Sequence, residues 1–206
     1  MAMAESRVAH LSKRSGKHAR PTDVPRPQLF VFGEIEGATP CHPLVRLYCS
    51  WRLAFDTTTW WVVQGETEGE TFVSDVGSQG FCSWNHRVSA HFAFRSLRGW
   101  PRLELEVRGT DSHGRNQFAG YGSWSLPAVP GTTEILCRCW RPVRAGFLAR
   151  LRARLLGAWP ELPRDASSGE MYGGASRAGL ETEDSVDVLL RLSVVHQHFE
   201  ANGLEA

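Results

Sequence analysis

The sequence predicts an all-β protein, built as a two-layer antiparallel β-sandwich. Several stretches alternate apolar and polar residues with a period of two, which is typical of strands buried on one face. The 20 glycines and 11 prolines among 206 residues indicate many turns. About eight such strands, joined by short turns, favour a sandwich over a helical bundle, and the length suits one domain.

Residues 1–28 differ in composition from the rest of the chain. They are polar and basic, with prolines at positions 21, 25 and 27. Such a segment buries too little apolar surface to offset the entropy lost on ordering. We therefore predict a disordered basic tail over residues 1–28 and one folded domain over residues 29–206. Contact of the tail with RNA, anionic lipid or an acidic partner is the alternative to a solvated tail.

Charge and cysteine content exclude several classes of protein. The formal net charge is +1, so no overall field steers the chain to nucleic acid. No apolar run reaches 18 residues and no signal-peptide pattern opens the chain, so we expect an intracellular protein. An odd number of cysteines without a CxxC pair predicts reduced thiols rather than disulfides or zinc ligands. The five are Cys41, Cys49, Cys82, Cys137 and Cys139.

The first strands follow the tail. We predict one from Leu29 to Glu36, which contains Phe30, Phe32 and Ile35 and ends at Gly37. A long half-buried strand is predicted next, from Leu44 to Phe55. Its apolar face combines residues of one parity: Val45, Leu47, Cys49, Trp51, Leu53 and Phe55.

The middle of the chain predicts two short strands and one long strand. The short ones, Thr59 to Val63 and Thr71 to Val76, are separated by a polar turn over residues 64–69. The long one runs from Phe81 to Phe94. Its buried face is predicted to contain Trp84, Val88, Ala90, Phe92 and Phe94.

A hairpin is predicted around residues 102–126. Leu103, Leu105 and Val107 alternate with Arg102, Glu104, Glu106 and Arg108, which predicts a strand with one apolar face. Pro101 cannot donate a ladder hydrogen bond, so the strand starts at or just after it. The loop over residues 110–115 leads to a second strand from Phe118 to Leu126. In that strand the glycines on both sides of Tyr121 indicate a bulge or a close backbone approach.

Two strands and a helix complete the domain. Strands are predicted over residues 134–140 and 186–195. Between them, residues 143–159 predict an inserted amphipathic helix, because Phe147, Leu151 and Leu155 recur at helical spacing among arginines. Residues 160–180, rich in serine, glycine and alanine, predict a loop.

The predicted helix is the candidate site of direct contact. Its arginines and apolar residues suit an interfacial helix on anionic lipid, the cover of a partner subunit, or packing on the sandwich with solvated arginines. The candidate partner or lipid contacts are Arg144, Phe147, Arg150, Leu151, Arg152 and Arg154.

Calcium binding and nucleophilic catalysis find weak support. A calcium site needs several loop carboxylates, and Asp111 is the one well-placed loop aspartate. Cys82, His86 and His91 form no nucleophile or metal motif, so packed and hydrogen-bonded side chains are the favoured interpretation. We expect no enzymatic activity, no cofactor and no small-molecule substrate.

An ordered series of short blocks resembles the B9-domain family. The blocks begin with Cys82-Ser83-Trp84-Asn85-His86 and His91-Phe92-Ala93, and continue from about Gly99 to Pro142. They are Gly99-Trp100-Pro101-Arg102-Leu103, Asp111-Ser112-His113-Gly114-Arg115, Gly120-Tyr121-Gly122, Pro127, Pro130-Gly131 and Trp140-Arg141-Pro142. The resemblance covers the chain from about Leu29 to its C-terminus, and we interpret these motif residues as structural.

The resemblance implies a sandwich similar to C2 domains in a protein of the ciliary basal body and transition zone. There the family's members form a subcomplex of the Meckel syndrome (tectonic-like) assembly, which supports ciliogenesis and gates the ciliary membrane. By this resemblance the chain is a scaffold that binds sibling B9-domain proteins. The alternative is a peripheral membrane module that binds phosphoinositide or other anionic lipid at the ciliary membrane surface, independently of calcium.

Overall fold

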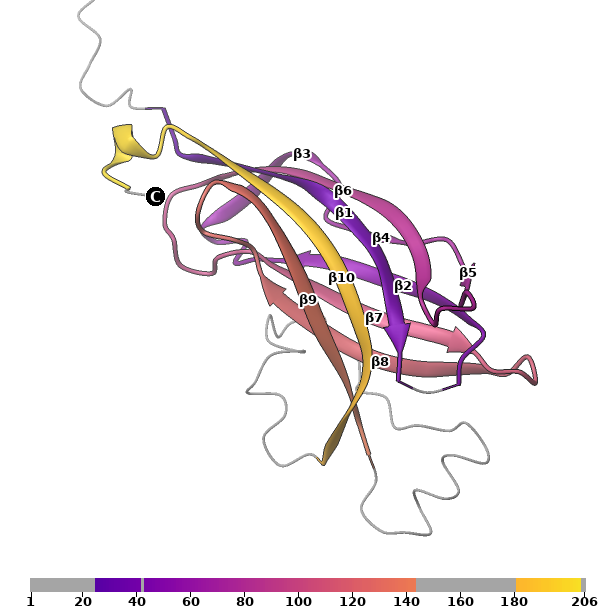
Figure 1. The fold of residues 1–206 in the computed structure, drawn as a ribbon. Coiled ribbons are helices and arrows are strands. Elements are labelled where there is room, and N and C mark those ends of the chain that lie inside the picture. The colour runs from indigo at the N-terminus through magenta and orange to yellow at the C-terminus, as the bar shows by residue number, and fades with distance from the viewer. Residues whose placement is uncertain (1–24, 42, 144–180, 205–206) are drawn as a thin grey trace, which may run out of the picture.

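The computed structural model describes residues 25–41, 43–143 and 181–204, which form ten β-strands and one short 3₁₀ helix. Figure 1 shows them as two curved layers. The strands are β1 (Gln28–Pro40), β2 (Arg46–Ala54), β3 (Trp60–Gly65), β4 (Glu68–Glu70), β5 (Ser74–Asp75), β6 (Cys82–Phe94), β7 (Arg102–Thr110), β8 (Asn116–Ser125), β9 (Gly131–Pro142) and β10 (Thr182–Gln197). The 3₁₀ helix η2 spans Glu200–Asn202.

One antiparallel sheet curls on itself to make both layers. Its strand order is β3-β6-β1-β10-β9-β8-β7-β2-β4, with β5 paired to β2. The strands β3, β6, β1, β10 and β9 form the first layer, and β8, β7, β2 and β4 form the second (Figure 1). The layers join where β8 meets β9, at the pair Tyr121 and Trp140. The predicted antiparallel sandwich is therefore confirmed.

The core lies between the layers and follows the predicted periodicity. In β2 every second side chain is buried, and β7 places Leu103, Leu105 and Val107 opposite them in the ladder. From the first layer, β1 and β10 contribute Leu29, Val31 and a run of alternating aliphatic residues. The core residues of β2 and of β10 are Leu47, Cys49, Trp51, Leu53, Val186, Val188, Leu190, Leu192 and Val194.

An aromatic cluster closes one end of the core. Trp60 stacks on Phe94 with ring centroids 4.1 Å apart and meets Trp100 edge-on at 5.2 Å. Its indole Nε1 donates a hydrogen bond to the carbonyl of Arg98 at 2.9 Å. Phe199, beyond the end of β10, packs edge-on against Phe94 at 5.4 Å. The cluster therefore links strands that are far apart in the sequence.

The glycines beside Tyr121 allow the two layers to approach each other. A Cβ at Gly120 would lie 2.2 Å from Ser185 Oγ, and a Cβ at Gly122 would lie 2.7 Å from Cys139 Sγ. Such distances are closer than side-chain carbons tolerate. The predicted close approach is the correct alternative for both positions.

Three local predictions are wrong. The first strand does not end at Gly37, because β1 continues to Pro40 past an irregularity between Ile35 and Gly37. The stretch 64–69 is not only a turn, because β4 begins at Glu68 and pairs with β2. Most of the stretch Thr71 to Val76 is irregular, and only the two residues of β5 form a strand there.

Several predictions fall outside the described residues. These are the helix over residues 144–159, the loop up to residue 180 and most of the tail over residues 1–28. The strand β1 begins at Gln28, and Pro25 accepts a hydrogen bond from Asn202 Nδ2 at 2.8 Å. Within the described residues, no helix has the length and apolar character needed to cross a membrane.

Candidate interaction surface

The outer face of the first layer carries exposed aromatic and aliphatic side chains. Phe30 lies in the ladder between Val195 of β10 and His91 of β6, and Phe32 follows two residues later on the same face. Phe32 and Val195 are each 46% exposed. We call this surface the β1–β10 face, and it consists of Phe30, Phe32, Trp61, His91 and Val195.

Side-chain contacts hold the aromatic part of the β1–β10 face in place. The rings of Phe30 and His91 stack with centroids 4.0 Å apart and planes 14° apart. His91 Nε2 also lies 2.9 Å from Gln28 Oε1, which fixes the imidazole ring. At the neighbouring strand β3, the guanidinium of Arg26 lies 5.0 Å from the ring centre of Trp61. The surface is therefore ordered before any partner binds.

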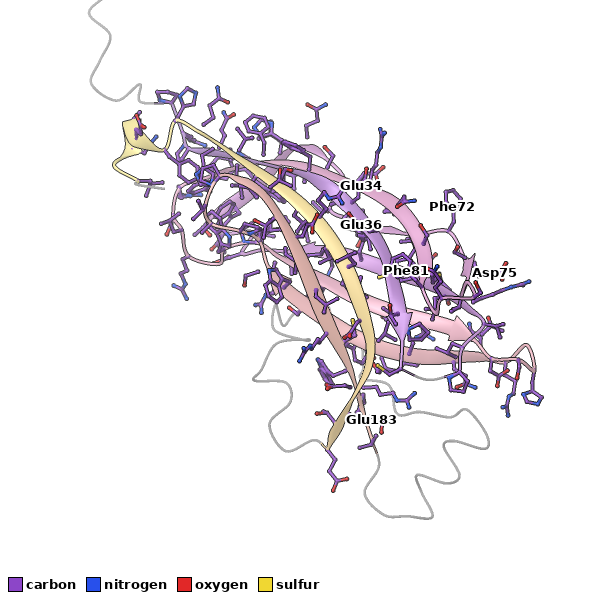
Figure 2. The ribbon with its side chains drawn as sticks, viewed as in Figure 1. Glu34, Glu36, Phe72, Asp75, Phe81 and Glu183 are labelled. Carbon is purple, nitrogen blue, oxygen red and sulfur yellow. The ribbon has the colours of Figure 1, made fainter. Side chains whose placement is uncertain are left out.

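Charged side chains border the β1–β10 face. Arg191 of β10 pairs with Glu36 at 2.7 Å and lies 3.4 Å from Glu134 of β9. Figure 2 shows Glu34 and Glu36 along β1, beside this pairing. Beyond it, Leu136 of β9 is exposed opposite Leu189 of β10. An apolar centre with a polar border is the usual anatomy of a protein–protein interface.

The second layer exposes apolar residues at a different place. Phe72 and Val73, between β4 and β5, are 87% and 60% exposed. Figure 2 shows Phe72 near Asp75, at the end of the molecule away from η2. They lie on a short connection, whereas the β1–β10 face spans neighbouring strands. The broad sheet face is the better candidate for a stable interface.

The cysteine and histidine residues of β6 are used in packing. Cys82 is buried, which raises the pKa of its thiol, and its Sγ donates to the carbonyl of Ser74 at 3.2 Å. His86 Nε2 accepts a hydrogen bond from Trp51 Nε1 at 2.9 Å. All five cysteines are free. Nothing in this arrangement activates a nucleophile.

Asp111 organises the loop between β7 and β8. Its Oδ1 accepts hydrogen bonds from the backbone N–H groups of His113 and Arg115, and its Oδ2 accepts from the side chains of Arg115 and Gln117. Burial opposes ionisation, but these donors lower the pKa of Asp111 to about 2. Among the described residues, no group of three or more acidic, histidine or cysteine side chains is arranged to hold a metal ion.

The comparison with protein families decides the relationship. The family described as "Ciliary basal body-associated, B9 protein" matches residues 29–195. The chain belongs to the B9 family. This match confirms the resemblance and places the ten strands within one family domain.

Individual B9 proteins are similar over most of the chain. B9 domain-containing protein 2 of Bos taurus is 35% identical over 178 residues, which cover 86% of this chain and 98% of that protein. The Homo sapiens protein of the same name is 33% identical with the same coverage. The Homo sapiens protein named "Tectonic-like complex member MKS1" is 37% identical over 107 residues, half of this chain and 19% of that protein.

A solved structure from another family was also compared. The C2A domain of a plant Extended Synaptotagmin 1 aligns with a TM-score of 0.45 and 12% identity, over 82% of this chain and 95% of that domain.

The B9 motif residues are mostly located within the sandwich. Trp84 Nε1 donates to the carbonyl of Leu47 at 3.1 Å, and Trp100 Nε1 donates to that of Leu126 at 2.9 Å. Gly99 adopts a φ of 69°, and a Cβ there would lie 2.2 Å from Asp56 Cβ. The buried motif residues are Phe92, Pro101, Gly120, Tyr121, Gly122 and Trp140. His91 differs from these, because its ring lies on the β1–β10 face.

Sequence reasoning missed the β1–β10 face. The signal that could have indicated it is the run from Leu29 to Phe32, which is apolar at both parities, so both faces of the strand carry apolar side chains. The adjacent Val194 and Val195 give the same signal in β10. The contact residues that the sequence did suggest, from Arg144 to Arg154, lie outside the described residues.

Proposed function

We propose that this B9 protein is a non-enzymatic scaffold subunit of the ciliary transition-zone Meckel syndrome (tectonic-like) complex. In that role it binds other B9-domain proteins at the basal body and supports ciliogenesis and the ciliary membrane gate. The β1–β10 face carries the proposal, because exposed aromatic side chains on a rigid sheet suit protein docking. Similarity to a protein named as a tectonic-like complex member supports the class of partner.

The charge of the face favours a protein partner over a membrane. Arg191 at its border is paired with Glu36 and approaches Glu134, so the face presents no concentrated positive charge. Anionic lipid surfaces attract clusters of unpaired basic residues. The alternative role as a calcium-independent lipid-binding module rests on Arg144, Arg150, Arg152 and Arg154, and it is kept as an outcome of the experiment.

Co-purification tests the proposed function. The full-length chain is co-expressed with the B9 region of an MKS1-type relative and analysed by size-exclusion chromatography with light scattering. We expect one stoichiometric complex. In parallel, the isolated chain is mixed with vesicles of phosphatidylcholine that contain phosphatidylserine or phosphoinositide, and we expect it to stay unbound in flotation. Two separately eluting proteins would contradict the scaffold role, and flotation of the isolated chain would then favour the membrane module.

A further inference from the structure

A second buried surface lies outside the core of the sandwich. Phe118 and Tyr121 of β8 and Trp140 of β9 are all buried, although none belongs to the core cluster between the layers. Their rings contact one another, with centroids 4.3 Å apart for Phe118 and Tyr121 and 5.7 Å apart for Tyr121 and Trp140. Aromatic side chains on the outside of a sheet are shielded from water only when something lies over them.

Two carboxylates lie buried on the same outer surface. Glu104 and Glu106 alternate with the core residues of β7, so they point away from the core, yet they are 1% and 6% exposed. This contradicts the prediction of a strand buried on one face only. Tyr121 lies directly opposite Glu106 in the ladder, which places the acidic and aromatic side chains together. We call this surface the β7–β8 outer face.

The described residues satisfy these carboxylates in part. Arg52 pairs with Glu104 Oε2 at 2.7 Å, and Arg108 pairs with Glu106 Oε1 at 2.7 Å. The other oxygen of Glu104, Oε1, is buried and accepts no hydrogen bond from any described residue. A buried carboxylate oxygen without a donor is costly, because its hydration has been lost without replacement. The surface therefore calls for a cationic donor.

No described element provides the cover. The main contacts of β7 are with its sheet neighbours β2 and β8, and β8 continues to β9. Elements of the first layer reach the second layer through the core, on the opposite side of β7. What covers Glu104, Glu106 and Tyr121 therefore lies among residues outside the described ranges or in a partner.

The segment that follows β9 has the matching chemistry and a suitable starting point. It begins three residues after Trp140, and the start of β10 pairs back onto the end of β9 at Arg141 and Glu183. It combines arginines with apolar side chains, which complement carboxylates and aromatic rings respectively. The relevant residues are Arg144, Phe147, Arg150, Leu151, Arg152 and Arg154.

The distances across the sheet are within reach of this segment. Neighbouring strands lie about 4.8 Å apart, so β7 is roughly 10 Å from Trp140 in β9. Eleven residues span about 16 Å even when helical, at about 1.5 Å per residue. We propose that residues 144–154 dock on the β7–β8 outer face of their own chain, with arginines paired to Glu104 and Glu106 and apolar residues against Tyr121 and Trp140.

Limited trypsin digestion of the isolated full-length chain tests this docking. Trypsin cleaves after arginine, and docked arginines are cleaved only when the segment opens. In a variant with Glu104→Gln and Glu106→Gln, we expect cleavage after Arg150, Arg152 and Arg154 to be about tenfold faster, because cleavage follows the open population. Cleavage after Arg87 and Arg191, in the central strands, reports global unfolding and is expected to stay unchanged.

A matched variant and two additions make the result decisive. Glu134→Gln removes a carboxylate from the other layer and is expected to leave cleavage of the segment unchanged. Equal cleavage rates in the wild type and in the Glu104/Glu106 variant would overturn the proposal. So would a wild-type segment that is cleaved rapidly and becomes protected only when a B9-domain partner or anionic vesicles are added, because the occupant or the role of the arginines would then differ. This outcome is separate from complex formation through the β1–β10 face.

Discussion

Trp60→Ala is expected to lower the free energy of unfolding by about 3–5 kcal/mol, the usual cost of deleting a large buried aromatic ring. Trp60 is fully buried and packs against Phe92, Phe94 and Trp100. Its loss leaves a cavity at the end of the core and removes the hydrogen-bond donor to the carbonyl of Arg98. For a chain of ordinary stability, much of the folded population would be lost.

Urea denaturation followed by far-ultraviolet circular dichroism measures this effect. Trp124→Ala is the matched control, because Trp124 lies exposed near the end of β8. We expect that control to change the free energy of unfolding by less than about 1 kcal/mol. Similar losses for the two variants would contradict the assignment of Trp60 to the core.

Phe32→Glu combined with Val195→Glu is expected to weaken partner binding by at least about 100-fold, since each central contact of an interface typically contributes a tenfold factor or more. The two side chains lie on the β1–β10 face and are both about half exposed, so charge at these positions burdens the interface more than the fold. Isothermal titration with the B9 region of an MKS1-type relative measures the affinity. This prediction rests on the proposed scaffold role.

Phe72→Glu serves as the control for that pair. Phe72 is the more exposed aromatic residue, but it lies on the β4–β5 connection rather than on the β1–β10 face. We expect its replacement to leave the affinity within about twofold of the wild type. An equal loss of affinity for Phe72→Glu would move the interface to the second layer or indicate a nonspecific effect of added charge.

Periodicity predicted the strands whose environment is simple. In β2 and β10 the apolar residues occur at one parity, and in both strands that parity faces the core. Local chemistry also placed the start of β7, because Pro101 lacks a ladder donor and β7 begins at Arg102. These features depend on neighbours in the sequence, so a single sequence is enough to predict them.

Other features depend on residues that are distant in the sequence. In β1 both parities are apolar, so the pattern could not tell that Leu29 and Val31 face the core while Phe32 faces outward. In β7 the charged parity suggested a solvated face, yet Glu104 and Glu106 are buried there. Charge alone does not reveal a cover supplied from elsewhere, and a strand's second neighbour is set by the sheet order.

The candidate site was the least predictable part of the protein. The amphipathic pattern around Arg150 indicated a contact segment but left its target open. The β1–β10 face became visible only through the ladder that places Phe30 between His91 and Val195. Those three residues come from three separate strands, and no local spacing connects them.

Hydroxyl-radical footprinting of the complex tests the central claim most directly. The full-length chain is oxidised alone and in complex with the B9 region of an MKS1-type relative, and side-chain modification is quantified by mass spectrometry. We predict that binding protects Phe32 and Trp61 on the β1–β10 face, while Phe72 is modified at the same rate in both samples. Unchanged modification of Phe32 and Trp61 in a fully formed complex would contradict docking through this face.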